Sequence, residues 1–425
     1  MSLKFVNRQQ ELDELTKLQK KGGLLAVYGR RRVGKTSLLT YWLKNHDGLY
    51  SQAVEGHKGI QISQIFQDLL PYLRSDIVPK TWSELFQLLE LEEKEVTLCL
   101  DEFPYLVAAD PSLPSLLQKW WDHRKKKGLF LILCGSSYHM MHNMFLHRSA
   151  PLFGRCQKII HIQPMGYRYF CNALSLKKFD VASFIKFSLV GGIPKYWEFI
   201  EKDSDAVLCA DTLYFGFAPY MENEPQRILQ DEKVSGIYSI SVLEAIGRGA
   251  TRPSEIAARL GVPQTQIAKV LYRLMDASLI IRDLPFGQSE KNPKNVLYRI
   301  GDPSIRFWYT VYSPHRTRWR SYDHRMKQKL LHDFASTVFE DYCRDQHQGA
   351  KKYWERNVEF DLVKLENENA EKSKPKLVVA EVKFTKLNQK NKNKTLFGLQ
   401  QKWFISKLSK KYSNVEFRII DQQVL

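Results

Sequence analysis

A glycine-rich segment near the amino terminus has residue types that bind a nucleotide phosphate chain. It reads Gly29, Arg30, Arg31, Arg32, Val33, Gly34, Lys35, Thr36 and Ser37 and fits the pattern GxxxxGK[ST]. In such a loop the backbone N–H groups wrap the phosphates, the lysine reaches the β- and γ-phosphates, and the threonine hydroxyl ligates Mg²⁺. The sequence therefore predicts an ATP and Mg²⁺ site lined by residues 29–37, with Lys35 as a catalytic residue and Thr36 as a metal ligand.

A pair of carboxylates follows another apolar run. Asp101 and Glu102 come directly after residues 96–100. Because ligands of α/β sheets bind at the carboxyl ends of the strands, Asp101 is predicted to hold Mg²⁺ and Glu102 to polarise the attacking water. A surface acidic pair is the alternative. The apolar run 129–134 ends in Ser136 and Ser137, where either a hydroxyl facing the γ-phosphate or a plain turn fits the sequence.

A second set of charged residues lies near the carboxyl terminus. Alternation within strands expected at residues 357–365 and 376–384 leaves Asp361 on the first, and places Glu381 and Lys383 on one face of the second. An acid facing an E-x-K pair predicts a divalent-metal site for phosphodiester hydrolysis, with Asp361 and Glu381 as ligands and Lys383 as the catalytic group that orients the nucleophile. Glu340, on a preceding helix, is an additional candidate ligand. An exposed charged pair on a strand is the alternative.

The elements that position the first site follow an α/β pattern. Residues 23–28 form an apolar strand that leads into the glycine-rich loop, and residues 35–44 form the following helix. A chain of 425 residues exceeds what one hydrophobic core usually serves, so two to four domains are expected.

Residues 236–300 read as three helices followed by a two-stranded hairpin. The helices are expected at 238–247, 253–260 and 264–278, and the hairpin strands at 279–284 and 295–300. This pattern predicts a winged helix-turn-helix, with outward residues on the third helix that would face a DNA groove and lysines on the wing that would meet phosphates. These residues are Gln264, Gln266, Lys269 and Arg273, and Lys291 and Lys294. A protein-interaction or spacer module is the alternative.

The overall composition favours a polyanionic partner. Sixty-four lysines and arginines against 46 acids give a formal net charge of +18, which favours nucleic acid, with DNA expected and RNA not excluded, and less often an acidic membrane surface. A solvated basic surface is the alternative. Residues 386–411 are rich in lysine and interrupted by Phe397, Trp403 and Phe404, a composition that suits backbone contacts without sequence readout. A solvated, lysine-coated terminal helix is the alternative.

Cysteine usage and hydropathy indicate the cellular compartment. The six cysteines are spread without a CxxC pair, and no apolar run approaches the length of a membrane helix, so a cytoplasmic protein without a membrane partner is predicted. His139, His142 and His147 lack accompanying carboxylates or cysteines, so no metal is expected there.

In the order of its motifs the chain resembles the archaeal-type ATPases, which belong to the AAA+-related, STAND-like P-loop proteins. The segments that carry the resemblance are residues 5–12, YGRRRVGKTSLL, LCLDEFPYL, LILCGSS, PLFGR (151–155) and GGIPKYW (191–197). The resemblance implies that residues 5–12 lie near the adenine, with Arg8 binding the nucleotide. It also implies that Arg155 serves as a catalytic arginine finger or sensor, in cis or in trans; a structural loop arginine is the alternative.

The same resemblance extends to the later parts of the chain. It implies that residues 191–197 begin a helical lid, where Lys195 is a weaker candidate for a phosphate contact. The C-terminal part looks like the PD-(D/E)xK restriction-endonuclease fold, although no clear motif follows Gln400 and Gln401.

Together these observations predict an α/β fold with four parts. They are a P-loop ATPase core at residues 1–165, a helical lid at 166–232, a winged helix at 233–302 and a nuclease-like α/β domain at 303–425. The predicted function is Mg²⁺-dependent ATP hydrolysis that controls a metal-dependent nuclease-like domain acting on nucleic acid, in a chain that could form a homo-oligomer. The alternatives are a STAND-type nucleotide switch with a non-catalytic tail, and a DNA-binding regulator that acts through the winged helix alone.

Overall fold

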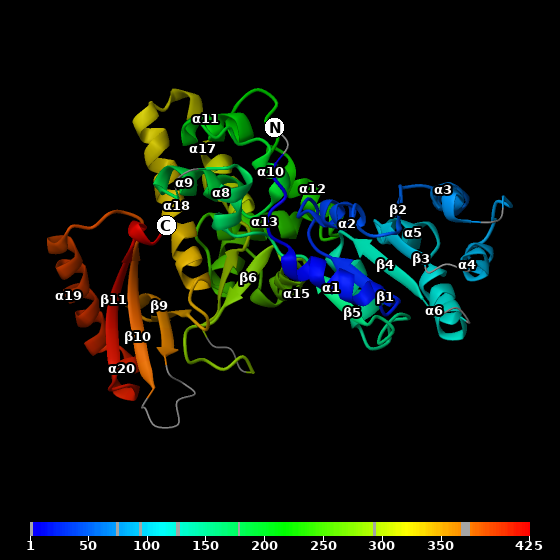
Figure 1. The fold of residues 1–425 in the computed structure, drawn as a ribbon. Coiled ribbons are helices and arrows are strands. Elements are labelled where there is room, and N and C mark those ends of the chain that lie inside the picture. The colour runs from blue at the N-terminus through cyan, green and yellow to red at the C-terminus, as the bar shows by residue number, and fades with distance from the viewer. Residues whose placement is uncertain are drawn as a thin grey trace.

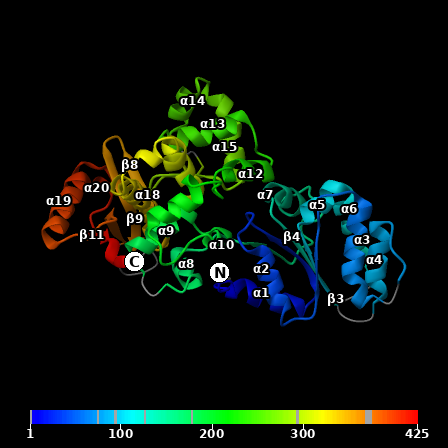
Figure 2. The same ribbon diagram turned by 90° about the horizontal axis from the view of Figure 1, so that it is seen from above.

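The computed structural model describes residues 3–73, 76–92, 96–124, 128–176, 179–291, 295–366 and 375–425. A five-stranded sheet lies at one end of the molecule and a four-stranded sheet at the other, with helices between them (Figure 1; Figure 2). Within the described residues, every helix is too short or too polar to cross a membrane.

The amino-terminal sheet is parallel, with strand order β2-β3-β4-β1-β5. Its strands are β1 (Gly23–Tyr28), β2 (Leu49–Gln52), β3 (Val96–Asp101), β4 (Leu129–Gly135) and β5 (Lys158–His161). The three central strands β1, β3 and β4 are buried along their whole length. That burial explains why they read as continuous apolar runs, because helices cover both faces of such a sheet.

Alternate residues of these strands enter two separate cores. One face packs on α1 (Gln9–Gln19) and α2 (Lys35–Leu43). The other face packs on α3 (Lys58–Leu69), α4 (Trp82–Leu91), α5 (Phe103–Ala109) and α6 (Leu113–His123). The short elements η1 (Leu70–Tyr72), α7 (Tyr138–Met141) and η2 (His142–Leu146) complete this part. The carboxyl ends of the strands remain free of these layers, which leaves that edge open for a ligand.

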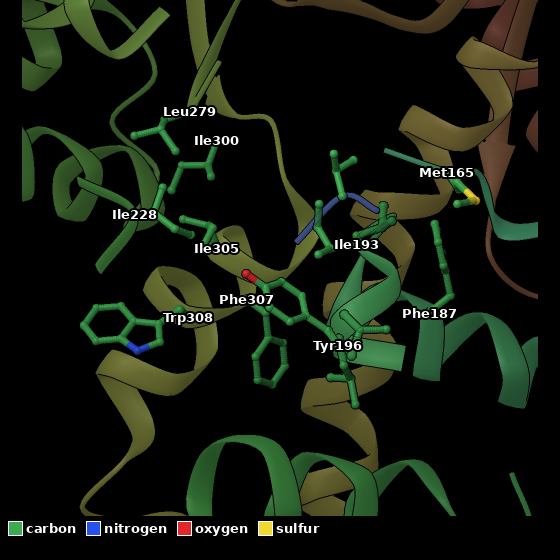
Figure 3. Packing of buried hydrophobic residues seen from close by; sticks show 14 of the residues in the cluster. Met165, Phe187, Ile193, Tyr196, Ile228, Leu279, Ile300, Ile305, Phe307 and Trp308 are labelled. Carbon is green, nitrogen blue, oxygen red and sulfur yellow. The ribbon is translucent and has the colours of Figure 1, made fainter. Parts of the chain in front are cut away.

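A helical body follows the sheet. It comprises α8 (Tyr167–Ala173), α9 (Val181–Val190), α10 (Pro194–Trp197), α11 (Ala206–Ala210), η3 (Asp211–Phe215) and α12 (Glu224–Asp231). Ile193, Tyr196 and Ile228 from this body lie close to Ile305 and Phe307 of a later helix (Figure 3). Residues far apart in the sequence therefore share one core.

Three helices and a hairpin come next, where the sequence predicted them. They are α13 (Ile237–Gly247), α14 (Pro253–Leu260), α15 (Gln264–Asp276) and the antiparallel pair β6 (Ile280–Asp283) and β7 (Leu297–Ile300). Ile267, Leu271 and Leu274 form the buried face of α15. Lys291 is an exposed residue of the connection between the strands, and Lys294 lies outside the described residues.

Residues 303–321 pack in the helical body rather than on the C-terminal sheet. They form α16 (Pro303–Phe307), η4 (Trp308–Tyr312), α17 (Ser313–His315) and η5 (Trp319–Ser321). The ring of Phe307 lies 4.6 Å from Tyr214, and Trp319 stacks on Phe215 at 3.9 Å. These aromatic residues place the segment with the helices before it, although the sequence grouped it with the domain that follows.

The C-terminal sheet has strand order β11-β10-β9-β8, in which β10 and β11 are parallel and the other pairs antiparallel. Its strands are β8 (Lys351–Glu355), β9 (Val358–Glu366), β10 (Lys376–Lys383) and β11 (Val415–Asp421). One face packs on α18 (His324–Asp345) and the other on α19 (Gln389–Ile405) and α20 (Lys407–Lys411). The turn η6 (Gln422–Val424) follows β11.

Candidate functional site

The glycine-rich loop joins β1 to α2 at the carboxyl edge of the parallel sheet. Gly29 lies so close to the chain after β5 that a Cβ there would be 2.5 Å from the carbonyl oxygen of Ile162. Gly34 has φ 97°, a left-handed conformation that favours glycine. The side chain of Val33 is fully buried beneath the loop. These constraints hold the loop around the amino terminus of α2, where N–H groups and the helix dipole attract an anion.

Lys35 points into this loop. Its Nζ donates hydrogen bonds to the carbonyl oxygens of Gly29 at 2.9 Å and Arg30 at 3.2 Å, and the residue is only 5% exposed. Thr36 and Ser37 occupy the first turn of α2. The ammonium therefore lies where a phosphate chain held by the loop would meet it.

Asp101 brings a carboxylate to the same place from the end of β3. Its Oδ2 accepts hydrogen bonds from the hydroxyl of Thr36 at 2.6 Å and that of Tyr50 at 2.7 Å. Burial alone would raise the pKa of Asp101, but hydrogen bonds from Cys134, Thr36 and Tyr50 hold it below its ordinary value. An ionised carboxylate beside a hydroxyl is the oxygen donor set that Mg²⁺ accepts, so these two residues fit that ion.

Glu102 follows in a conformation that is unusual for glutamate. Its φ of 53° and ψ of 40° lie in the left-handed region, and Oε1 accepts a hydrogen bond from the hydroxyl of Ser136 at 2.6 Å. Such backbone conformations persist where surrounding structure imposes them, often at functional sites. The two side chains line a cavity of about 750 Å³ that Arg31, Asp231 and Lys233 also line.

The three consecutive arginines of the loop each pair with a different acid from the later part of the chain. Arg30 reaches Asp302 at 2.5 Å. Arg31 forms a two-pronged pair with Asp231, with both contacts at 2.7 Å. Arg32 pairs with Glu224, which also accepts a hydrogen bond from the hydroxyl of Tyr196 at 2.6 Å. We call these three contacts the arginine ladder, and they bind the loop to α12 and to the start of α16.

Arg8 is a buried residue that donates hydrogen bonds to the loop and to the chain after β5. The residue is 3% exposed, and its guanidinium donates to the carbonyl oxygens of Gln163 at 2.7 Å and Val33 at 3.3 Å, and to Glu11. Burial lowers the pKa of Arg8, and the neighbouring Glu11 opposes that effect. Arg8 therefore lies next to the phosphate-binding loop, but its hydrogen bonds go to protein groups.

Lys195 lies near the other side of the loop. Its neighbour Pro194 begins α10, and a Cβ on Gly34 would lie 4.0 Å from that proline. The Lys195 ammonium pairs with Glu198 at 2.6 Å on the surface.

Arg155 lies away from the phosphate-binding loop. It precedes β5, whose first residue Lys158 pairs with Leu25 near the start of β1. The loop instead follows the last residue of β1, so the length of the strand, roughly 20 Å, separates the two. The Arg155 guanidinium holds Asp122 at 2.7 Å. Within one chain, Arg155 therefore cannot reach the phosphates that Lys35 would bind.

The predicted C-terminal residues are neighbours in the structure. Asp361 of β9 lies beside Glu381 of β10, and its Oδ2 accepts the backbone N–H of Val382 at 2.8 Å. Burial, and then the Glu381 charge, raise the pKa of Asp361. Burial raises the pKa of Glu340 on α18 to about 7, and the charge of Asp361 adds to the effect. Two buried acids with raised pKa values, next to the Glu381 carboxylate, indicate a candidate functional site.

Two lysines neutralise one member of this acidic cluster. Lys383 donates to Oε1 of Glu381 at 2.8 Å, and Lys402 of α19 donates to Oε2 at 3.2 Å. Across the described residues, no three His, Cys, Asp or Glu side chains converge as ligands of one metal ion. In this arrangement, lysine ammonium groups take the place of a cation at Glu381.

Two residues near the carboxyl end of α15, Tyr272 and Asp276, lie near residues of the amino-terminal part. Asp276 lies 3.5 Å from His139 of α7. Tyr272, together with Tyr138, His161 and Arg282, lines a second cavity of about 730 Å³ between the two parts. Gln264, Lys269 and Arg273 are exposed.

The sequence analysis missed several members of these sites. Asp302, Asp231 and Glu224 carry no motif, and no local signal connects them to Arg30–Arg32 because the contacts form only in the folded chain. Lys402 follows Gln400 and Gln401, and its position on the sheet-facing side of α19 was available from helical spacing. Lys233, two residues after the end of α12, has φ 55° and lines the same cavity as Glu102, and no sequence motif marks it.

The amino-terminal part matches a family of known proteins. Residues 5–198 match the family described as an ATPase domain predominantly from Archaea. A solved structure, the Walker-type ATPase PABY2304 of Pyrococcus abyssi, is similar with a TM-score of 0.52 and 20% identity, covering 72% of this chain and 96% of that chain. The similarity to that structure shows a common fold.

Two proteins of Methanocaldococcus jannaschii are similar in sequence. The uncharacterized protein MJECL04 is 25% identical over 428 residues, which cover 94% of this chain and 91% of that protein. The uncharacterized ATP-binding protein MJ0423 is 49% identical over 43 residues, which cover 10% of this chain and 73% of that protein. The first similarity spans both sheets.

Proposed function

Residues 5–198 form an archaeal-type P-loop ATPase domain, and from this premise we propose that the chain hydrolyses ATP with Mg²⁺ and uses the nucleotide state to control its later modules. The contact between Thr36 and Asp101, 2.6 Å apart beside the Lys35 loop, carries this proposal. It brings the two predicted metal ligands together from segments that are distant in the sequence.

Each residue of the site has a distinct part in this mechanism. The N–H groups of residues 29–34 bind the phosphates, and Lys35 leaves the carbonyl oxygens of the loop to neutralise phosphate oxygens. Thr36 and Asp101 would hold Mg²⁺, which supplies charge neutralisation at the β- and γ-phosphates. Glu102 orients the attacking water and accepts its proton, while Ser136 holds the Glu102 carboxylate in place.

Two residues are candidates for the positively charged side chain that stabilises the developing charge on the γ-phosphate. Lys233 lines the cavity of Glu102 within the same chain. Arg155 lies at the opposite edge of the sheet and would serve only a neighbouring copy in a homo-oligomer.

The arginine ladder supports a switch, the second candidate function. Nucleotide phosphates would compete with Asp302, Asp231 and Glu224 for the charges of residues 30–32, so loading the loop would weaken its hold on α12 and α16. A STAND-type regulator requires such a link between nucleotide state and later modules. The switch and the ATPase are compatible, because hydrolysis and phosphate release would allow the three arginine–carboxylate contacts to form again.

The C-terminal module is proposed to act on nucleic acid. Its PD-(D/E)xK-like cluster would hold Mg²⁺ through Asp361 and Glu381, with Glu340 nearby and Lys383 orienting the nucleophile. Residues 237–300 would be a winged helix that contacts DNA, or RNA, through Lys269, Arg273 and Lys291. A regulator that acts through this winged helix alone is favoured less, since the acidic cluster would then have no role.

The nuclease proposal is tested with Glu381→Ala in the full chain. We expect the wild type to nick DNA or RNA with Mg²⁺, and the variant to lose nicking while ATP hydrolysis persists. Phe217→Ala, at a residue that is 99% exposed, serves as the matched control. If the wild-type protein cuts neither DNA nor RNA with any divalent metal, the nuclease proposal is contradicted and the nucleotide switch with a non-catalytic tail is favoured.

A further inference from the structure

One exposed face of α19 combines lysines and aromatic rings. Residues that recur three and four positions apart lie on one face of a helix. On α19 one such row points to solvent and contains Lys390, Lys394, Phe397, Gln401 and Phe404. We call it the outer row, and the opposite face packs Leu399 and Trp403 on the sheet.

The outer row is unusually exposed for its residue types. Phe397 is 63% exposed and Phe404 is 73% exposed. Both views show α19 at the outer end of the molecule, beyond the C-terminal sheet (Figure 1; Figure 2). Within the described part of the chain, no acid forms an ion pair with Lys390 or Lys394. By contrast, Lys392 and Lys402 on the inner side pair with Asp421 and Glu381.

A partner helix does not suit this row. Its spacing is that of a coiled-coil seam, where five such positions are normally apolar. Here a partner helix would bury Lys390, Lys394 and Gln401 together with only two rings. Lysine is also depleted in the cores of protein interfaces. The row therefore offers charge and ring faces without a continuous apolar surface.

We propose that the outer row of α19 binds single-stranded nucleic acid, with bases stacked on Phe397 and Phe404 and phosphates held by Lys390 and Lys394. This inference rests on the proposed action on nucleic acid and names the form of nucleic acid. A duplex keeps its bases stacked inside and cannot offer their faces to these rings, whereas every unpaired base can.

The dimensions of the row fit an extended strand. Phe404 lies seven positions after Phe397, which corresponds to roughly 10 Å along a helix. The two rings therefore lie about two helical turns apart, so that different bases of one strand could stack on them. Gln401 lies between the rings, where its amide can contact sugar or phosphate. Lys390 and Lys394 extend the row by another two turns.

The test measures binding of labelled oligonucleotides to the full chain by fluorescence anisotropy, in EDTA and without ATP. The probes are oligo-dT and oligo-rU of about 12 nucleotides and a blunt DNA duplex of the same length. The variants are Phe397→Ala/Phe404→Ala and Lys390→Gln/Lys394→Gln. Phe217→Ala is the aromatic control, and Lys20→Gln/Lys21→Gln, at exposed lysines of the amino-terminal part, is the charge control.

We expect the phenylalanine pair variant to lose tenfold or more in affinity for the single strands, with duplex binding and the control variants unchanged. The lysine pair variant should flatten the slope of log K against log salt by about 1.4 for single strands. Comparison of oligo-dT with oligo-rU identifies whether DNA or RNA is preferred.

Other outcomes overturn the inference. Unchanged single-strand affinity in the phenylalanine variant, or equal loss for duplex, excludes stacking on this row. A change in sedimentation of the variant without a change in binding would make the row an interface between copies of the chain. Because the buffer holds no metal or ATP, failure of nicking or hydrolysis leaves this result untouched.

Discussion

The guanidinium of Arg30 lies 2.5 Å from a carboxylate oxygen of Asp302, so the phosphate-binding loop is joined directly to the first residue before α16. Both side chains are largely buried, at 16% and 7% exposure. Asp302 also caps α16 by accepting the N–H of Ile305 at 3.0 Å. This pair therefore fixes the phosphate-binding loop against the start of α16, whose own place in the helical body comes from aromatic contacts such as Phe307 with Tyr214.

The Arg30–Asp302 pair should contribute strongly to stability. We expect Asp302→Asn to lower the free energy of unfolding by about 3 kcal/mol, because it keeps a capping side chain but leaves the buried Arg30 charge unpaired. Urea denaturation of the full chain measures this loss. The matched control is Asp231→Asn, whose more exposed pair with Arg31 should cost less than about 1 kcal/mol. Equal losses in both variants would contradict the account of the ladder.

Glu232 should make stability fall as pH rises through neutrality. Burial raises its pKa from 4.5 to about 7, although the N–H of Tyr138 and the charges of Lys35 and Arg30 favour ionisation. Between these values the folded state binds more protons than the unfolded state. The stabilisation is therefore complete below about pH 4.5 and is lost as the pH rises through 7, by up to roughly 3 kcal/mol.

The measurement compares urea midpoints of the wild type and Glu232→Gln at pH 5 and pH 7.5. Glutamine cannot ionise, so the variant should lose less stability than the wild type between these two pH values. Glu340, whose pKa burial also raises to about 7, contributes a separate slope that Glu340→Gln removes. Identical pH profiles for the wild type and Glu232→Gln would show that Glu232 ionises normally in the folded chain.

Arg155 should act between copies of the chain if it acts in catalysis. Mixing Arg155→Ala with Glu102→Gln should restore ATP hydrolysis above the sum of the two variants, because the second variant supplies the arginine that the first lacks. Steady-state phosphate release at rising total protein concentration measures the effect. Simple addition of the two rates would leave Arg155 as the structural partner of Asp122.

The sequence predicted the elements whose signals are local. The buried strands β1, β3 and β4 are apolar runs, and their carboxyl ends carry Gly29, Asp101 and Ser136, so their meeting at one edge follows from a parallel sheet. The same rule, applied to Arg155, would have placed it at the opposite edge, because it precedes its strand rather than following it.

The remaining contacts depend on tertiary structure. Arg31 and Asp231 are in contact, but strands β2 to β5 lie between them in the sequence. No pattern in either segment predicts that it will meet the other. The two lysines that contact Glu381 differ in the same way. Alternation along β10 predicted that Lys383 lies beside Glu381, whereas Lys402 lies on α19 and meets Glu381 only because that helix packs on the sheet. Local periodicity assigns a residue to a face, and packing between elements decides which faces meet.

The most direct test of the account is steady-state Mg·ATP hydrolysis by the full chain, with and without duplex DNA, for wild type, Lys35→Ala and Glu102→Gln. We predict hydrolysis by the wild type, loss of ATP binding in Lys35→Ala, and retained binding with a rate at least a hundredfold lower in Glu102→Gln. Stimulation by DNA would connect the ATPase to nucleic acid. Hydrolysis that survives in both variants, or wild-type protein that neither binds nor hydrolyses ATP, would contradict the assignment of this site.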